Sequence, residues 1–207
     1  MITRDVNYAV LAAKNKLLNN TDTIVFTEDD DFNTVRLKIS QVAPNSRIVV
    51  YNNSKITKMY DMFYCCEASY IDLTNFDTSK VVDMNSMFCR CEAETLDMRG
   101  MDTSHVKNMS CMFSRCKIQN ILFGNINTSS VTDMSGMFQY SKVNMLDLKS
   151  FDLSNVKDFY DMFFACKANV IDIRNFSASF VEKNKESLFK YCQAEVILPN
   201  NERVLYE

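Results

Sequence analysis

Residues 71–91 read IDLTNFDTSKVVDMNSMFCRC and residues 96–116 read LDMRGMDTSHVKNMSCMFSRC, so the chain repeats itself after 25 residues. The dipeptide Met-Phe begins at residues 62, 87, 112, 137 and 162, and a degenerate copy, Leu188-Phe189, follows after 26 residues. A constant period of roughly 20 to 50 residues is the sequence signature of solenoids and related repeat folds. We therefore expect one elongated array of about six turns over residues 46–198, with a capping region at 1–45 and a cap strand at 199–207.

Each copy contains an apolar-polar-apolar triplet: Ile71-Asp72-Leu73, Leu96-Asp97-Met98, Ile121-Leu122-Phe123, Leu146-Asp147-Leu148 and Ile171-Asp172-Ile173. Such alternation predicts a short strand with one buried face. We expect parallel strands centred on residues 72, 97, 122, 147 and 172, stacked about 4.8 Å apart. Because the chain has only 3 Gly and 2 Pro, its Asn, Asp, Ser and Thr residues must make most of the turns.

The second half of each copy has two interpretations. Val81, Met84, Met87, Phe88 and Cys91 are spaced by three and four residues, which places them on one face of a helix. A bridge strand at residues 81–84 followed by a tight turn through residues 87–88 fits equally well, because so short a window does not separate the two.

The ends of the chain depart from the repeat. Val6, Val10, Ala13 and Leu17 form a helical stripe, and residues 23–26 and 30–42 predict a strand and a second helix that ends before Pro44. At the other end, residues 196–198 and 203–206 predict two strands joined by a turn. Solenoids cover the exposed ends of their core with such atypical units, so we interpret both ends as caps.

Composition narrows the classes of function. Hydrophobic residues make up 47% of the chain, which is enough for a core, and the net charge of -3 argues against a nucleic-acid partner. No apolar run reaches the roughly 18 residues that a membrane span needs, and the N-terminus lacks the pattern of a signal peptide. We therefore expect a cytoplasmic protein with reduced thiols and no membrane contact.

The run Phe-Asp-Thr-Ser-x-Val-x-x-Met-x-x-Met-Phe-x-x-Cys resembles the 25/26-residue repeats of BspA-like leucine-rich-repeat proteins, which include surface lipoproteins of mycoplasmas. The resemblance covers residues 46–198. It implies a right-handed leucine-rich-repeat-like solenoid. Together with the elements read from the residues, we expect an α/β repeat fold with short parallel strands, short helical turns, a helical N-terminal cap and a β C-terminal cap. The resemblance also implies adhesion or protein binding, and it brings no catalytic residues.

The cysteines are interpreted as a structural feature. One repeat position holds Cys66, Cys91, Cys116, Cys166 and Cys192, with Ser141 in the remaining copy. A small buried column accepts Cys and Ser alike, whereas a metal ligand or disulfide partner would not be exchanged in this way. The spacing forms no paired CxxC motif and the chain has a single His, so we expect no metal, no cofactor and no nucleophilic catalysis. Cys65, Cys89 and Cys111 lie outside the column and are the expected reactive thiols.

The outward strand positions indicate a contact surface. Asp72, Asp97, Asp147 and Asp172 would form an acidic ladder, and the residues two positions later are mostly basic, so the face neutralises itself. The third copy breaks both columns, with Leu122 in place of Asp and Gly124 in place of the base. An apolar spot framed by charges is typical of an interaction hot spot. The expected partner-binding residues are Tyr70, Asp97, Arg99, Leu122, Met145, Asp147, Lys149 and Arg174.

From these observations we expect a non-catalytic solenoid that binds a protein partner through this strand face. The alternative surface is the loop after each Met-Phe, which carries Tyr64, Arg90, Arg115, Tyr140 and Phe164. A small viral or phage-encoded inhibitor of a host protein is one version of this hypothesis. The alternative function is a surface or adhesion protein of the BspA-like type that is exported by an unrecognised route.

Overall fold

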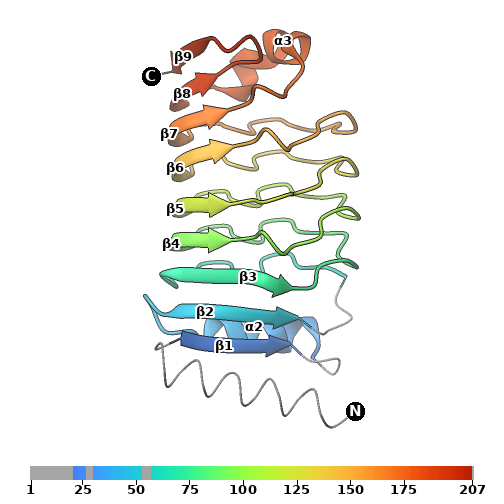
Figure 1. Cartoon of the computed structure of the whole chain (residues 1–207), viewed down its shortest axis with the longest axis vertical. Coiled ribbons are helices and arrows are strands. Elements are labelled where there is room, and N and C mark those ends of the chain that lie inside the picture. Colours follow the sequence, from blue (N-terminus) through green and yellow to red (C-terminus); the bar gives the residue numbers. More distant parts are fainter. Residues whose placement is uncertain (1–20, 27–29, 53–56, 207) are drawn as a thin grey trace.

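The computed structural model of the chain describes residues 21–26, 30–52 and 57–206. Its strands form one nine-stranded sheet in the order β1 to β9, and every neighbouring pair is parallel except β8 and β9 (Figure 1). The chain is thus a parallel-strand β-solenoid of about six turns with few helices. The helical stripe expected from Val6 to Leu17 lies outside the described residues.

The elements follow the repeat. In chain order they are β1 (Thr21–Phe26), α2 (Phe32–Ser40), β2 (Arg47–Asn52), β3 (Tyr70–Phe76), β4 (Glu92–Asp97), β5 (Lys117–Leu122), β6 (Lys142–Asp147), β7 (Lys167–Asp172), α3 (Ala178–Leu188), β8 (Gln193–Ile197) and β9 (Arg203–Tyr206). The expected parallel strands are therefore confirmed, but β4 to β7 end at residues 97, 122, 147 and 172 instead of being centred on them.

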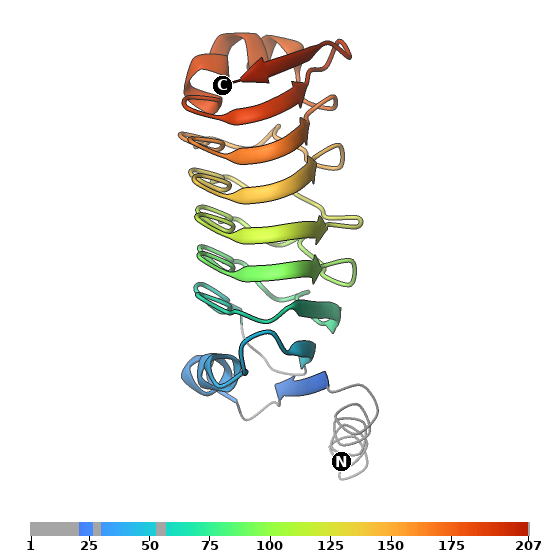
Figure 2. The same cartoon turned by 90° about the vertical axis from the view of Figure 1, so that its left-hand side faces the viewer.

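In the copies joined by isolated bridges, the second half of the coil is a bridge and a turn, so the helical interpretation is wrong there; in the last copy the corresponding residues form the helix α3 (Ala178–Leu188). Isolated parallel bridges join Lys58 to Asp83, Asp83 to Asn108, Asn108 to Asp133 and Asp133 to Asp158. The reason lies in the backbone hydrogen bonds: the N–H of Phe88 donates to the C=O of Met112 at 2.9 Å, in the next coil. Because the coils stack in register, these bonds between coils replace the bonds that a helix would make within one coil. The edge-on view shows the resulting stack of flat coils (Figure 2).

Short polar side chains make the corners of each coil. In the coil that follows β3, the carboxylates of Asp72, Asp77 and Asp83 each accept a hydrogen bond from the backbone N–H two residues later, all at 3.0 Å. Such Asx turns redirect the chain without glycine. The turn after the bridge is tighter, and there Ser86 and Arg90 adopt φ of 54° and 57°, a left-handed conformation that costs a non-glycine residue roughly 1 kcal/mol or more.

Phenylalanine rings form the centre of the core. Phe63, Phe88, Phe113, Phe138, Phe163 and Phe189 stack face to face, with ring centroids 5.1–5.7 Å apart and interplanar angles of 3–18°. All six side chains are buried. The third ring, Phe113, also meets Phe123 edge-on at 5.8 Å. Each of the four inner rings therefore packs against the ring of the coil before it and the ring of the coil after it.

We expect Phe113→Ala to destabilise the protein by about 3–5 kcal/mol, because the change removes a buried ring and leaves a cavity between two others. Tyr160→Ala is the matched control, since 67% of the Tyr160 side chain is exposed, and a loss within about 0.5 kcal/mol is expected there. The free energy of unfolding from urea denaturation measures both. Equal losses in the two variants would contradict the assignment of the phenylalanine column to the core.

Acid should reduce the stability that the aspartates contribute at the corner turns of the coils. The serine two residues later lowers the pKa of Asp77, Asp102 and Asp152 by donating hydrogen bonds to each carboxylate. At Asp77 the serine hydroxyl has the larger effect, and at Asp102 and Asp152 the serine backbone N–H does. Since their folded pKa values lie below the value of about 3.9 for an unfolded Asp, these carboxylates contribute stability that is fully present above about pH 4. That stability is lost as the pH falls through the folded pKa values.

The triple variant Asp77→Asn, Asp102→Asn, Asp152→Asn should therefore show a shallower fall in Tm between pH 5 and pH 3 than the unaltered chain. Asn is a suitable replacement because Asn127 already makes the same turn in the third copy, where it accepts the N–H of Ser129 at 3.0 Å. Identical pH profiles in thermal unfolding would show that these carboxylates do not titrate below the unfolded value.

Candidate functional site

The aspartates on the outward strand face are corner residues as well as charges. Asp72, Asp97, Asp147 and Asp172 each accept the backbone N–H of the residue two positions later, at 3.0–3.3 Å. This bond turns the backbone away from the sheet at the ends of β4, β6 and β7, whereas β3 continues to Phe76 and β5 ends at Leu122 without it. These aspartates therefore serve the local turn as well as any contact with a partner.

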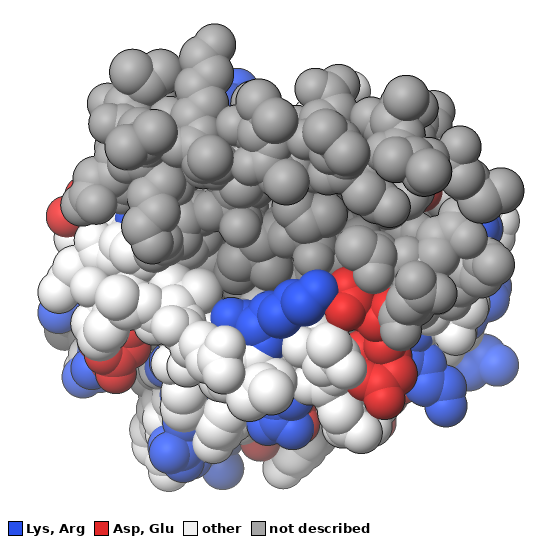
Figure 3. Space-filling model, turned by 90° about the horizontal axis from the view of Figure 1, so that it is seen from below, with Lys and Arg blue, Asp and Glu red and all other residues white. Residues whose placement is uncertain are grey.

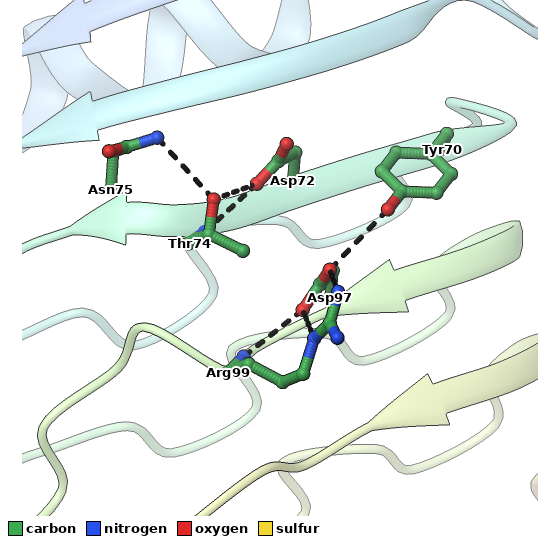
Figure 4. Close-up of polar contacts among 6 residues, drawn as sticks. All are labelled: Tyr70, Asp72, Thr74, Asn75, Asp97 and Arg99. Atoms are coloured by element: carbon green, nitrogen blue, oxygen red, sulfur yellow. Dashed lines mark hydrogen bonds and ion pairs between the residues drawn. The ribbon is translucent and has the colours of Figure 1, made fainter.

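Asp97 is enclosed by its neighbours. Two nitrogens of the Arg99 guanidinium donate to its carboxylate at 2.9 and 2.6 Å, and Tyr70 on β3 directs its hydroxyl at the same group at 3.4 Å (Figure 4). The guanidinium of Arg47 lies 4.2 Å from the centroid of the Tyr70 ring. Asp97 is 1% exposed, and the hydrogen bonds from Arg99 lower its pKa. Two residues expected to meet a partner, Tyr70 and Asp97, thus hold each other in place, and the solvent-facing group here is Arg99.

The next ion pairs along the face repeat this arrangement. Arg174 donates through two nitrogens to the buried carboxylate of Asp172 at 3.0 and 2.7 Å, and these bonds lower the pKa of Asp172. Lys149 lies 3.0 Å from Asp147 and 4.0 Å from Asp172. Asp97, Asp147 and Asp172 are therefore paired with bases of the same chain, whereas Asp72 accepts hydrogen bonds from Thr74. Seen from its N-terminal end, the described part of the molecule likewise shows basic and acidic side chains side by side (Figure 3).

Leu122 interrupts the paired charges. Its side chain is 37% exposed, and Met145, which lies opposite Asn120 in the sheet register, is 44% exposed. A hollow of about 350 Å³ is lined by Leu122, Gly124, Arg99, Asp147 and Lys149, among others. Gly124 has φ of 65°, and a Cβ there would lie 2.9 Å from the Cα of Arg99, so the missing side chain is imposed by backbone packing. We call Leu122, Gly124 and Met145 the Leu122 patch.

A row of rings follows the loops on another edge of the coils. Tyr140 and Phe164 meet edge-on with centroids 5.2 Å apart, and Phe164 meets Tyr191 in the same way at 5.4 Å. The guanidinium of Arg115 lies 4.5 Å from the centroid of the Tyr140 ring. The sequence pattern named this loop as the alternative surface but missed Tyr191, because the 26-residue spacing of the last copy shifts that residue out of alignment.

The cysteine column is part of the core, as expected. Cys66, Cys91, Cys116, Cys166 and Cys192 are buried. Ser141 fits among them because its hydroxyl donates to the C=O of Phe138 at 2.7 Å and lies 3.3 Å from the sulfur of Cys166. Within the described residues, no group of three or more His, Cys, Asp or Glu side chains could hold a metal ion, and no helix is long and apolar enough to cross a membrane.

Thiol labelling should separate the cysteines by their environment. Cys65 is exposed, whereas Cys89 and Cys111 are half-buried, and desolvation raises the pKa of both. With a dithionitrobenzoate reagent at pH 8, the native protein should label Cys65 rapidly and Cys89 and Cys111 slowly, because the thiolate is the reacting form. The five buried thiols should react only after denaturation. Cys65→Ser should remove the rapid phase, and a rapid phase of several thiols would contradict the burial of the column.

Two overlapping segments, residues 30–125 and 90–197, match one protein family, described as Mycoplasma protein of unknown function, DUF285. No curated protein and no solved structure matches the chain. The two matching segments together run from residue 30 to residue 197 of the 207 residues, and the chain therefore belongs to the DUF285 family.

Proposed function

We propose that this chain is a non-catalytic solenoid that binds another protein, and that the Leu122 patch is the centre of the contact. The observation that carries the proposal is the exposure of Leu122 and Met145 on a face where the neighbouring charges are paired. Apolar anchors surrounded by a polar rim are the usual composition of binding hot spots. The hollow beside Gly124 offers room for one side chain of the partner.

The charged residues around the patch suit the role of a rim. Arg99, Lys149 and Arg174 are each held by a carboxylate of this chain, so they present ordered donors without leaving a buried charge unpaired. A partner that covers Leu122 therefore loses little electrostatic energy at the edges of the contact. The repeated coil extends this surface along the stack, as solenoids that bind proteins commonly do.

A second candidate surface for the same function is the row of Tyr140, Phe164 and Tyr191. Tyr, Phe and Arg are enriched at the centres of interfaces, and here three rings in contact lie beside Arg115. The row lies in the turns between coils and does not share residues with the Leu122 patch. Variants of either surface can therefore be compared in one assay.

We also propose that the fold belongs to the leucine-rich-repeat-like class of the BspA type. The support is the 25-residue coil with one strand and one bridge, together with the repeat motif itself. In this assignment α2 is a helical N-terminal cap, since its Val35 and Ile39 are buried against the first coils, and the β8–β9 pair is a β C-terminal cap. The antiparallel strand β9 ends the parallel stack, which is what a cap must do.

Leu122→Asp tests the patch. The variant should keep the Tm, because Leu122 is exposed and Asp occupies this position in the other repeats, while an unpaired carboxylate inside a docked interface costs several kcal/mol. That cost corresponds to a loss of affinity of about 100-fold or more. Val82→Asp is the matched control, since Val82 is 39% exposed and lies on the bridge side of the coil.

The measurement is quantitative mass spectrometry of proteins retained from a native lysate by three immobilised baits: the unaltered chain, Leu122→Asp and Val82→Asp. A protein retained by the unaltered chain and by Val82→Asp but lost with Leu122→Asp is the expected result. Equal retention by all three baits would exclude the Leu122 patch as the contact.

A further inference from the structure

A groove of about 540 Å³ runs along the stack at the beginning of the strands, apart from the Leu122 patch. One wall is the column formed by the first residues of strands β4 to β8, which reads Glu92, Lys117, Lys142, Lys167 and Gln193. The second column lies two residues later in the repeats and reads Glu94, Gln119, Asn144 and Asn169. Between the columns lie the small buried side chains of Ala93, Val143 and Ala168.

The positive charge in this groove is only partly neutralised. Lys117 forms an ion pair with Glu92 at 2.5 Å. Lys142 and Lys167 are register partners in adjacent parallel strands, and neither has an ion pair or a side-chain hydrogen bond to another described residue. Their Cα atoms are about 4.8 Å apart, and like charges directly opposite one another destabilise a sheet. The half of the groove over β6 and β7 is therefore basic and exposed, whereas Glu67 and Glu94 line the other half.

The second column suits a polypeptide backbone. Gln119, Asn144 and Asn169 are exposed and follow one another on adjacent strands. A side-chain amide carries both a donor and an acceptor, so it can bond to both groups of a peptide unit, whereas a row of phosphates or sulfates needs donors alone. This combination of amides and lysines favours an acidic peptide over a nucleic acid or a sulfated polymer.

We propose that this groove binds an extended acidic segment of a partner polypeptide, with two carboxylates over Lys142 and Lys167. Adjacent strands lie about 4.8 Å apart, so the distance from β4 to β8 is roughly 19 Å, and at about 3.3 Å per residue it accommodates some six residues. Acidic side chains at alternate positions of such a segment project to one side about 6.6 Å apart, within reach of the two flexible lysines. The inference goes beyond the Leu122 patch, because it concerns a second surface.

The test uses the fluorescein-labelled peptide Ser-Ser-Glu-Ser-Glu-Ser-Ser and its counterpart with Gln in place of both Glu. Fluorescence anisotropy at low ionic strength compares the unaltered chain with Lys142→Gln/Lys167→Gln. The matched control is Lys107→Gln/Lys157→Gln, which removes the same charge from two exposed lysines beside the bridges. The groove variant should bind the acidic peptide about tenfold more weakly, as expected for the loss of two exposed charge pairs, while the control variant binds like the unaltered chain.

Thermal unfolding gives a second readout that does not depend on the peptide. Removing two like charges should leave the Tm of Lys142→Gln/Lys167→Gln unchanged or raise it at low salt, and added salt should remove the difference. Equal binding of the acidic peptide by the groove variant, or equal binding of the Gln peptide by the unaltered chain, would overturn the proposal. So would stronger binding of heparin or single-stranded DNA than of the acidic peptide. Leu122→Asp should bind the peptide normally, so a failure of the patch and a failure of the groove are distinguishable.

Discussion

Equivalent side chains of successive coils lie directly over one another at the spacing of neighbouring strands, and the rest of the structure depends on this stacking. The backbone bonds that maintain it run between coils, as from the N–H of Phe113 to the C=O of Met137 at 2.9 Å. A coil closes its own turns, as from the N–H of Met87 to the C=O of Met84 at 3.2 Å, but its strand and bridge pair with the coils on either side, which therefore stabilise it. Any residue type that recurs at one position must therefore pack well against copies of itself.

Each column satisfies that requirement in its own way. Phenylalanine rings stack in parallel, and the hydroxyl of Thr78 donates to the C=O of Asp102 in the next coil at 2.7 Å, a bond that Thr103 repeats with Asn127 at 2.8 Å. Carboxylates would repel one another in such columns. They are tolerated because the corner aspartates accept backbone N–H groups, and because Arg99 and Arg174 cover the most buried of them.

The same requirement makes departures from the repeat informative about function. At Leu122 the acidic column stops and an apolar side chain is exposed, and at Lys142 and Lys167 two like charges adjoin without a described counter-ion. Neither feature improves the stacking of the coils, since one exposes apolar surface and the other sets like charges opposite each other. The contacts proposed above would give a physical reason for both. The two surfaces lie at different places along the strands.

The sequence by itself determined the period, the parallel strands, the buried phenylalanine and cysteine columns and the position of the apolar gap at Leu122, because residues that must pack against their own copies recur at fixed spacing. It did not decide between a helix and a bridge for the segment after each strand, and it placed the centres of β4 to β7 too far toward the C-terminus. It also counted Tyr70 and Asp97 among the residues that meet a partner, although they bond to each other. Only the tertiary structure decided these points, since they depend on hydrogen bonds between residues about 25 positions apart, such as Tyr70 with Asp97 and Phe88 with Met112. Local spacing carries no information about where a backbone N–H will find its acceptor once the coils are stacked.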